Sequence, residues 1–125
     1  MSIVNCKVKY LRPKYQNLEE WMNDPNNVYI GRAGIVFING KRFPQKPSPF
    51  HNPYKIGKNG TREQVIQNYR IYIEEKLEKS PYLMKKLIDM DGKNLGCWCY
   101  PESCHGDVLL ELIQKYKITL IHGDK

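Results

Sequence analysis

The spacing of apolar residues along the chain predicts several short strands. Over residues 3–10 apolar and polar residues alternate, which is the period of a strand with one buried face. Residues 28–31 predict a second strand, and residues 118–121 predict a last one. Residues 95–99 are nearly all apolar, which is typical of a strand inside a sheet that is covered on both faces.

A hairpin and a long loop are predicted between the second strand and the main helices. Asn39-Gly40 separates residues 35–38 from residues 41–43, and both residues accept the positive φ of a type I′ turn. Residues 44–60 carry four prolines and two glycines without apolar periodicity. We expect an ordered loop there, and ordered loops of this length are often functional.

Capping residues mark the predicted helices. Thr61 and Gln64 form a capping box before a stripe of apolar residues at helical spacing, from Val65 to Leu77. Asn17 and Ser80 are the expected caps of two shorter helices. A further helix is predicted over residues 107–116.

This order of elements predicts one fold class. The 125 residues suit a single domain over the whole chain. A strand, a crossover helix and a second strand favour parallel pairing. We expect a small α/β domain with a mixed, partly parallel sheet flanked by helices, with a β-hairpin and a long ordered loop. Ligands of such sheets bind beyond the carboxyl ends of the strands.

The charge is concentrated in one half of the chain. The formal net charge is +7. Residues 1–62 hold 11 Lys or Arg against 3 Asp or Glu, whereas residues 63–125 hold 9 against 10. This asymmetry suits an anionic partner, either a phosphorylated small molecule or a nucleic acid. A Lys-rich surface that only keeps the protein soluble has the same composition.

A cysteine-rich turn is expected between the central strand and the last helix. Three readings of it stay open. In the first, a zinc ion is held by Cys97, Cys99, Cys104 and His105. In the second, Cys104 is a reactive thiol whose pKa is lowered by His105 and by the helix N-terminus. In the third, the cysteines are small core residues, which is the reading we favour for Cys97.

Candidate site residues come from the turn and from the long loop. For chemistry the candidates are Cys104, His105 and Asp107, although Asp107 also suits the helix dipole alone. The loop at residues 48–62 mixes aromatic rings with cations and a helix N-terminus, which suits stacking on a base and binding of phosphate. The ligand-binding candidates are Arg32, Ser48, Asn52, Tyr54, Lys55, Thr61 and Arg62. Trp21 and Trp98 are assigned to the core.

Residues 28–113 resemble one family of domains of unknown function found in phages, bacteria and large DNA viruses. The likeness rests on residues 29–32, 48–54 and 60–62, and above all on the ending GCWC-x-P-x-x-CHGDVL at residues 96–109. The Cys-x-Cys and Cys-His pattern is also similar to the close of a second uncharacterised family, in which Arg stands in place of Gly106. Neither resemblance implies an established activity.

We therefore expect a nucleotide or another phosphorylated ligand to bind between the Ser48–Arg62 loop and the Cys99–Asp107 turn, with enzymatic activity left open. The alternatives are non-specific binding of DNA or RNA by the basic half, and a zinc-stabilised interaction module. No apolar run is long enough to cross a bilayer, so no membrane partner is expected. The expected compartment is the cytoplasm, or the host cytoplasm, nucleus or virion for a viral chain.

Overall fold

The computed structural model of the chain describes residues 2–99 and 102–121, with side chains up to residue 118. Its main sheet has the order β1-β5-β2. The strands are β1 (Ser2–Asn5), β5 (Asn94–Cys97) and β2 (Asn27–Tyr29). Both outer strands are parallel to β5. The predicted parallel sheet is confirmed, and the apolar strand β5 lies at its centre.

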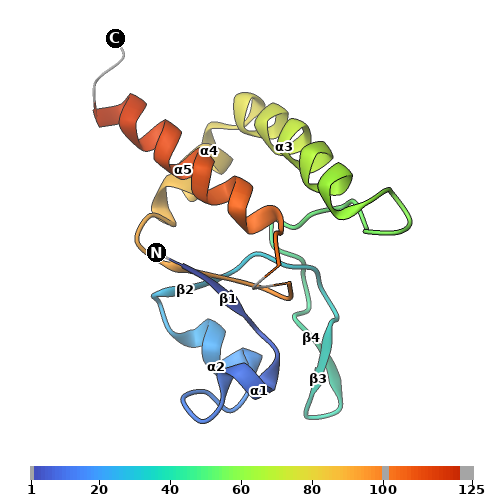
Figure 1. Ribbon diagram of the computed structural model, residues 1–125. Coiled ribbons are helices and arrows are strands. Elements are labelled where there is room, and N and C mark those ends of the chain that lie inside the picture. Colours follow the sequence, from blue (N-terminus) through green and yellow to red (C-terminus); the bar gives the residue numbers. More distant parts are fainter. Residues whose placement is uncertain (1, 100–101, 122–125) are drawn as a thin grey trace.

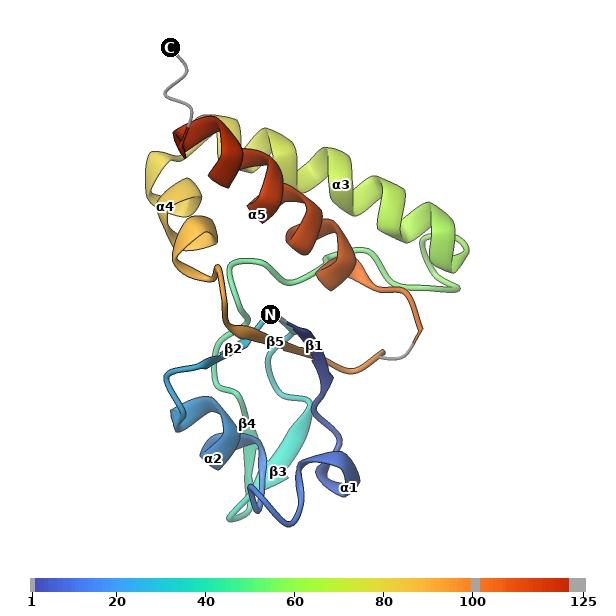
Figure 2. The same cartoon turned by 60° about the vertical axis from the view of Figure 1, so that its left-hand side comes forward.

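The sheet separates two layers of other elements (Figures 1 and 2). One layer holds the helices α3 (Arg62–Lys79), α4 (Pro81–Asp89) and α5 (His105–Ile121). The other layer holds α1 (Val8–Leu11), α2 (Leu18–Asn23) and the hairpin of β3 (Val36–Ile38) and β4 (Lys41–Phe43). Among the described helices, none is both long and apolar enough to cross a membrane.

Each layer has its own apolar core, and β5 contributes to both. Leu95 and Cys97 are buried with the residues of α3, α4 and α5. Gly96 faces the other layer, where an added Cβ would collide with the side chains of Trp21 and Cys6. Glycine at this position therefore lets the second core approach the backbone of the central strand.

Local signals placed the helix starts and the hairpin correctly. The Thr61 hydroxyl accepts a hydrogen bond from the Gln64 amide, and the Gln64 side chain accepts one from the Thr61 amide, which completes the capping box. Asn17 and Ser80 cap α2 and α4 in the same way. In the hairpin turn Asn39 has a φ of 52° and Gly40 a φ of 76°, as a type I′ turn requires.

Two predicted strands were wrong in extent or in kind. The strand over residues 3–10 ends at Asn5, where the side-chain oxygen accepts the Lys7 amide and turns the chain. Val8 and Tyr10 are consequently exposed on α1, because β5 ends at Cys97 and offers them no partner. Residues 118–121 continue α5 as helix. Extending the helix gives the backbone of these residues hydrogen-bond partners without a neighbouring strand. This gain outweighs the strand preference of their β-branched side chains.

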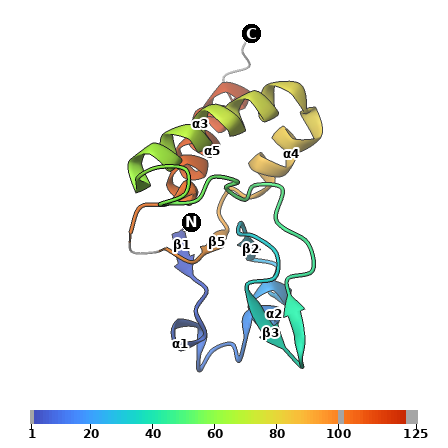
Figure 3. The ribbon, with the colours of Figure 1, turned by 90° about the vertical axis from the view of Figure 1, so that its right-hand side faces the viewer.

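The loop at residues 44–60 contains no helix or strand, as expected. It leaves β4, passes between the sheet and the helical layer, and joins α3 (Figure 3). Phe50 anchors it in the core, and the Tyr69 hydroxyl donates a hydrogen bond of 2.6 Å to the Phe50 carbonyl. The loop is thus packed under α3, and its second half lies where β2 and β5 end.

Candidate functional site

A cavity of about 410 Å³ opens beyond the carboxyl ends of β2 and β5. Its size falls within the range of small-molecule sites, roughly 300–1,000 Å³. The walls come from the ends of the two strands, the long loop, the first turns of α3 and the start of α5. The lining residues used below are Arg32, Asn52, Tyr54, Lys55, Arg62, Trp98, Cys99, Cys104 and His105. The crevice expected from the sequence is therefore present in the structure.

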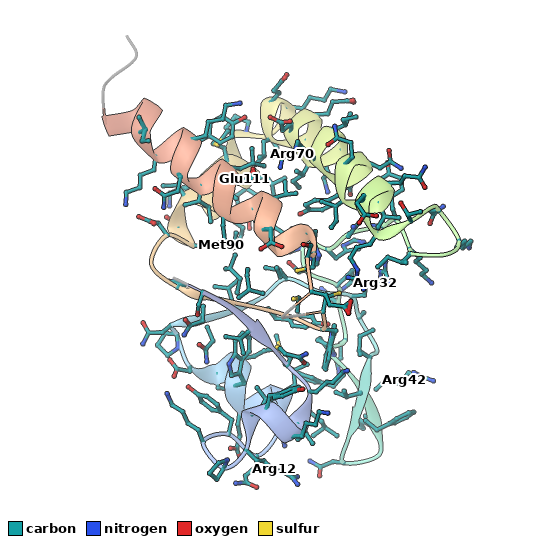
Figure 4. All side chains as sticks on the ribbon, in the orientation of Figure 1. Arg12, Arg32, Arg42, Arg70, Met90 and Glu111 are labelled. Atoms are coloured by element: carbon teal, nitrogen blue, oxygen red, sulfur yellow. The ribbon has the colours of Figure 1, made fainter. Side chains whose placement is uncertain are left out.

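Arg32 fixes the loop wall of the cavity. It follows β2, and its Nε and Nη2 donate hydrogen bonds of 3.0 and 2.8 Å to the Asn52 carbonyl. Nη2 also donates to the Tyr54 carbonyl at 2.9 Å. Arg32 lies between the helical layer and the hairpin in Figure 4. The planar guanidinium ties the loop to the end of β2. Arg32 therefore stabilises the structure whether or not it also contacts a ligand.

Two aromatic side chains from distant parts of the sequence line the cavity. Tyr54 comes from the loop and meets the Tyr72 ring edge-on, with 6.0 Å between ring centroids. Trp98 follows β5, and its indole N–H donates to the Tyr29 hydroxyl at 2.8 Å. That hydroxyl donates in turn to the Arg32 carbonyl at 2.7 Å. Trp98 is half-buried: it packs against the core that contains Trp21, as expected, and it also lines the cavity.

Arg62 connects α3 to the cysteine turn. One guanidinium nitrogen donates to the Ser103 carbonyl at 2.8 Å, and another pairs with the Glu102 carboxylate at 2.6 Å. Arg62 also helps to lower the pKa of the Cys99 thiol. Its position as the first residue of α3 follows from the Thr61 cap, which fixes where the helix begins.

His105 is a buried side chain that lines the cavity. Its Nε2 lies 2.7 Å from the Ile30 carbonyl, and a carbonyl only accepts, so Nε2 carries the proton. Burial lowers the pKa of His105 to about 4, and the ring is therefore neutral at neutral pH. The other ring nitrogen, Nδ1, has no hydrogen-bond partner among residues 2–99 and 102–121. Nδ1 of the neutral ring can therefore accept a hydrogen bond.

The thiol of the turn whose pKa is lowered is Cys99 and not Cys104, for which the lowered pKa was expected. Cys104 precedes α5 as expected, but it is 4% exposed. Hydrogen bonds with the thiols of Cys97 and Cys99, together with burial, raise the pKa of Cys104. The pKa of Cys99 is lowered to about 6, first by the hydrogen bond from Cys104 and then by Arg62. At Cys104 the neighbouring thiols and burial thus raise the pKa more than the helix N-terminus lowers it.

Three of the predicted site residues do not line the cavity. The Ser48 hydroxyl accepts the Phe50 amide inside the loop, and Thr61 caps α3. Asp107 is exposed and accepts the Cys104 amide at 3.1 Å, which caps the start of α5. Their polar atoms satisfy backbone groups, which is the commoner use of such residues at turns.

Several lining residues were missed by the sequence reasoning. Cys99 was considered as a zinc ligand or a core residue, and Ile35, Val65 and Ile66 were not expected to line the crevice. Val65 and Ile66 lie in the first turns of α3, and the apolar stripe of this helix has the spacing of ordinary core residues. The one usable signal was their position directly after the helix cap, where a helix start faces the strand ends.

The described residues do not fit the zinc reading of the cysteine turn, which was one of three left open. Among residues 2–99 and 102–121, no group of three or more His, Cys, Asp or Glu side chains is arranged to hold a metal ion. The Sγ atoms of Cys97 and Cys104 lie 3.2 Å apart, in direct contact with each other. None of the four cysteines forms a disulfide.

The comparison with known proteins identifies the family. A family model described as "Domain of unknown function (DUF4326)" matches residues 14–115. The chain belongs to this family. The match includes every element that builds the cavity and begins earlier than the resemblance over residues 28–113 suggested. The expected kinship with phages and large DNA viruses is confirmed by two relatives of this DUF4326 chain.

The first relative is the "Uncharacterized protein R718" of Acanthamoeba polyphaga mimivirus. It is 34% identical over 101 residues, which are 72% of this chain and 71% of the relative. The second is the "Uncharacterized 12.4 kDa protein in nrdA-td intergenic region" of Enterobacteria phage T4. It is 28% identical over 61 residues, and this chain spans 56% of its length. No solved structure matches the chain.

Proposed function

We propose that this cavity binds a nucleotide or another small phosphorylated ligand. The observation that carries the proposal is the charge of the lining. Arg32, Lys55 and Arg62 border the cavity, and among the described residues no Asp or Glu does. A cleft with charge of one sign attracts ligands of the opposite sign. An anion is therefore the ligand that this lining favours.

The three cations differ in how freely they can meet a phosphate. Lys55 is exposed on the loop. Arg62 is paired with Glu102, whose side chain is 64% exposed, so an anion can compete for the guanidinium at small cost. Arg32 holds the loop with Nε and Nη2, while Nη1 makes no hydrogen bond to the described residues.

The aromatic residues favour a nucleotide over a bare phosphate. Tyr54 and Trp98 border the same cavity as the cations. Aromatic rings stack on any base, at about 1–3 kcal/mol per base. A ligand with both a planar ring and a phosphate would use both kinds of wall, and the volume of about 410 Å³ suits a mononucleotide.

Any chemistry in this site would use Cys99 and His105. Cys99 supplies a thiolate at neutral pH, and His105 supplies an unprotonated nitrogen. Cys104 and Asp107 are withdrawn from the catalytic set, because the first is buried with a raised pKa and the second caps α5. A thiolate and a neutral imidazole at one cavity are compatible with an enzyme acting on the bound ligand.

Calorimetric titration with AMP, NAD, inorganic phosphate and adenosine tests the proposal. We expect AMP to bind more tightly than adenosine or phosphate alone. Arg62→Gln should weaken AMP binding at least about tenfold, since a charged hydrogen bond is worth about 1.5–3 kcal/mol. The matched control is Arg70→Gln. Arg70 lies on the same helix, is paired with Glu111 and is equally exposed, at 31% against 30% for Arg62.

In Figure 4 Arg70 and Glu111 meet between α3 and α5, away from the cavity. Unchanged binding in Arg70→Gln and weakened binding in Arg62→Gln support the site. Equal binding in both variants, or no binding of any phosphorylated compound to the native protein, overturns it.

Binding of DNA or RNA remains the second candidate function, because exposed cations gather in the layer of α1, α2 and the hairpin. They are Lys7, Lys9, Arg12, Lys14, Lys41 and Arg42. Phosphate contacts of this kind give an affinity that falls steeply with salt. Binding of a short DNA duplex that is lost in Lys9→Gln/Arg42→Gln and retained in Arg62→Gln supports this function. Binding that ignores salt excludes it.

A further inference from the structure

The hairpin and the long loop belong to a segment of the chain without acidic residues. Residues 25–62, from the turn before β2 to the first residue of α3, contain seven Lys or Arg and no Asp or Glu. Two of these cations, Arg32 and Arg62, are half-buried in the wall of the cavity. The other five are exposed: Lys41, Arg42, Lys46, Lys55 and Lys58. An anionic ligand that extends from the cavity over the hairpin or the loop would therefore still meet positive charge.

One face of the hairpin continues the wall of the cavity. Ile35 directly precedes β3 and lines the cavity, and Phe37 lies two residues further along the chain. Residues two apart in a strand point to the same face and lie about 6.6–7 Å from each other. The exposure alternates accordingly, because Val36 and Ile38 pack against the second core while Ile35 and Phe37 are exposed. Phe37 therefore lies on the same surface as the wall of the cavity.

Phe37 and Arg42 form a cation–aromatic pair on this face. They lie opposite each other in the antiparallel pairing of β3 and β4, and the Arg42 Cζ is 4.8 Å from the centroid of the Phe37 ring. Phe37 nevertheless stays 65% exposed. In Figure 4 Arg42 points away from the hairpin, on the same side of the molecule as Arg32. An exposed ring beside a cation offers a stacking surface for a base and a positive charge for its phosphate.

We propose that the cavity takes one nucleotide of a single-stranded nucleic acid and that the neighbouring nucleotide lies on the Phe37–Arg42 pair. This inference rests on the proposed nucleotide site and extends it along the hairpin. Aromatic rings combined with cations along a surface bind single strands without reading their sequence. A base in a duplex is paired and stacked, and it must be extruded before it can enter a cavity. The surface therefore favours single strands over duplexes.

Fluorescence anisotropy with a short, labelled oligonucleotide of deoxyadenosine tests the inference. Its affinity is compared with that of deoxyadenosine monophosphate (dAMP), measured by calorimetry, and with that of the same oligonucleotide annealed to its complement. We expect the single strand to bind more tightly than the duplex and at least about tenfold more tightly than dAMP, because one further base is stacked. Excess dAMP should displace the labelled strand, since both occupy the cavity, and this measurement needs no variant.

Variants separate the hairpin from the cavity. Phe37→Ala should weaken binding of the single strand about tenfold and leave dAMP binding unchanged, since only the stacked neighbour is lost. Arg62→Gln should weaken binding of both ligands. The matched control is Tyr82→Ala. Tyr82 is 68% exposed and has the Lys86 ammonium 5.3 Å from its ring centroid, but it lies on α4, which contributes no described residue to the cavity.

Four results overturn the inference: a single strand that binds no more tightly than dAMP, a duplex that binds as tightly as the strand, equal strand binding by Phe37→Ala and Tyr82→Ala, or strand binding that neither dAMP nor Arg62→Gln weakens. If dAMP still binds in these cases, the proposed nucleotide site stands without its extension along the hairpin. If neither dAMP nor the strand binds the native chain, the nucleotide site and the extension both fail.

Discussion

Replacing Arg32 with lysine removes most of the bonds that hold the long loop to the sheet. The guanidinium donates three hydrogen bonds to the carbonyls of Asn52 and Tyr54. An ammonium is a point donor and cannot span both carbonyls as the fork does, so Arg32→Lys keeps one bond and loses two. At about 1–2 kcal/mol for each half-buried bond of a charged donor, the variant loses about 2–4 kcal/mol of stability.

Two measurements check this loss. Urea denaturation gives the free energy of unfolding, and limited trypsin digestion reports opening of the loop, because Lys55 and Lys58 are exposed cleavage sites within it. We expect faster cleavage there in Arg32→Lys. The control is Arg42→Lys, since Arg42 donates a single exposed bond of 2.9 Å to Gly34 and should cost less than about 0.5 kcal/mol. Equal stabilities and equal cleavage rates for the two variants would refute the role given to Arg32.

Three further predictions concern the core, the buried histidine and the reactive thiol. Gly96→Ala should cost about 1–3 kcal/mol in urea denaturation, because its Cβ would meet Trp21 and Cys6; an unchanged midpoint counts against this packing. The unfolded chain protonates His105 near its ordinary pKa of 6.5 and the folded chain only near 4, so stability on the order of 3 kcal/mol is lost as pH falls between these values. His105→Gln keeps a donor for the Ile30 carbonyl and should lack this component, whereas identical pH profiles of both proteins would contradict it. Alkylation of Cys99 by iodoacetamide should have its midpoint near pH 6 and shift upward in Cys104→Ala; a native midpoint near 9 is the contrary result.

Local chemistry made much of the fold predictable. The caps at Asn17, Thr61 and Ser80 act through atoms a few residues away, so the helix starts could be read from the chain. The hairpin followed from Asn39-Gly40 for the same reason. The failures were tertiary. No local rule says that β5 is too short to pair with residues 7–10, or that α5 continues through residues that favour strands.

The site could be located from the sequence but not assigned in detail. The cysteine turn was expected at the carboxyl end of the central strand, where ligands of parallel sheets bind, and the loop was expected to form the other wall of that crevice. Which cysteine is activated depends on contacts across the turn and with α3. Arg62 reaches Cys99, while Cys97 and Gly106 surround Cys104, and none of these distances follows from spacing along the chain.

The two tryptophans allow the most direct test of the binding site. Trp98 lines the cavity, and Trp21 is buried in the opposite layer, so their indole N–H signals in a nitrogen–proton spectrum report on different places. The signals are assigned with Trp98→Phe, and AMP is titrated into the labelled protein. We predict that the Trp98 signal shifts and saturates while the Trp21 signal stays fixed. Saturating shifts confined to α1 and the hairpin, or no shift of Trp98 at any AMP concentration, would contradict the proposed site.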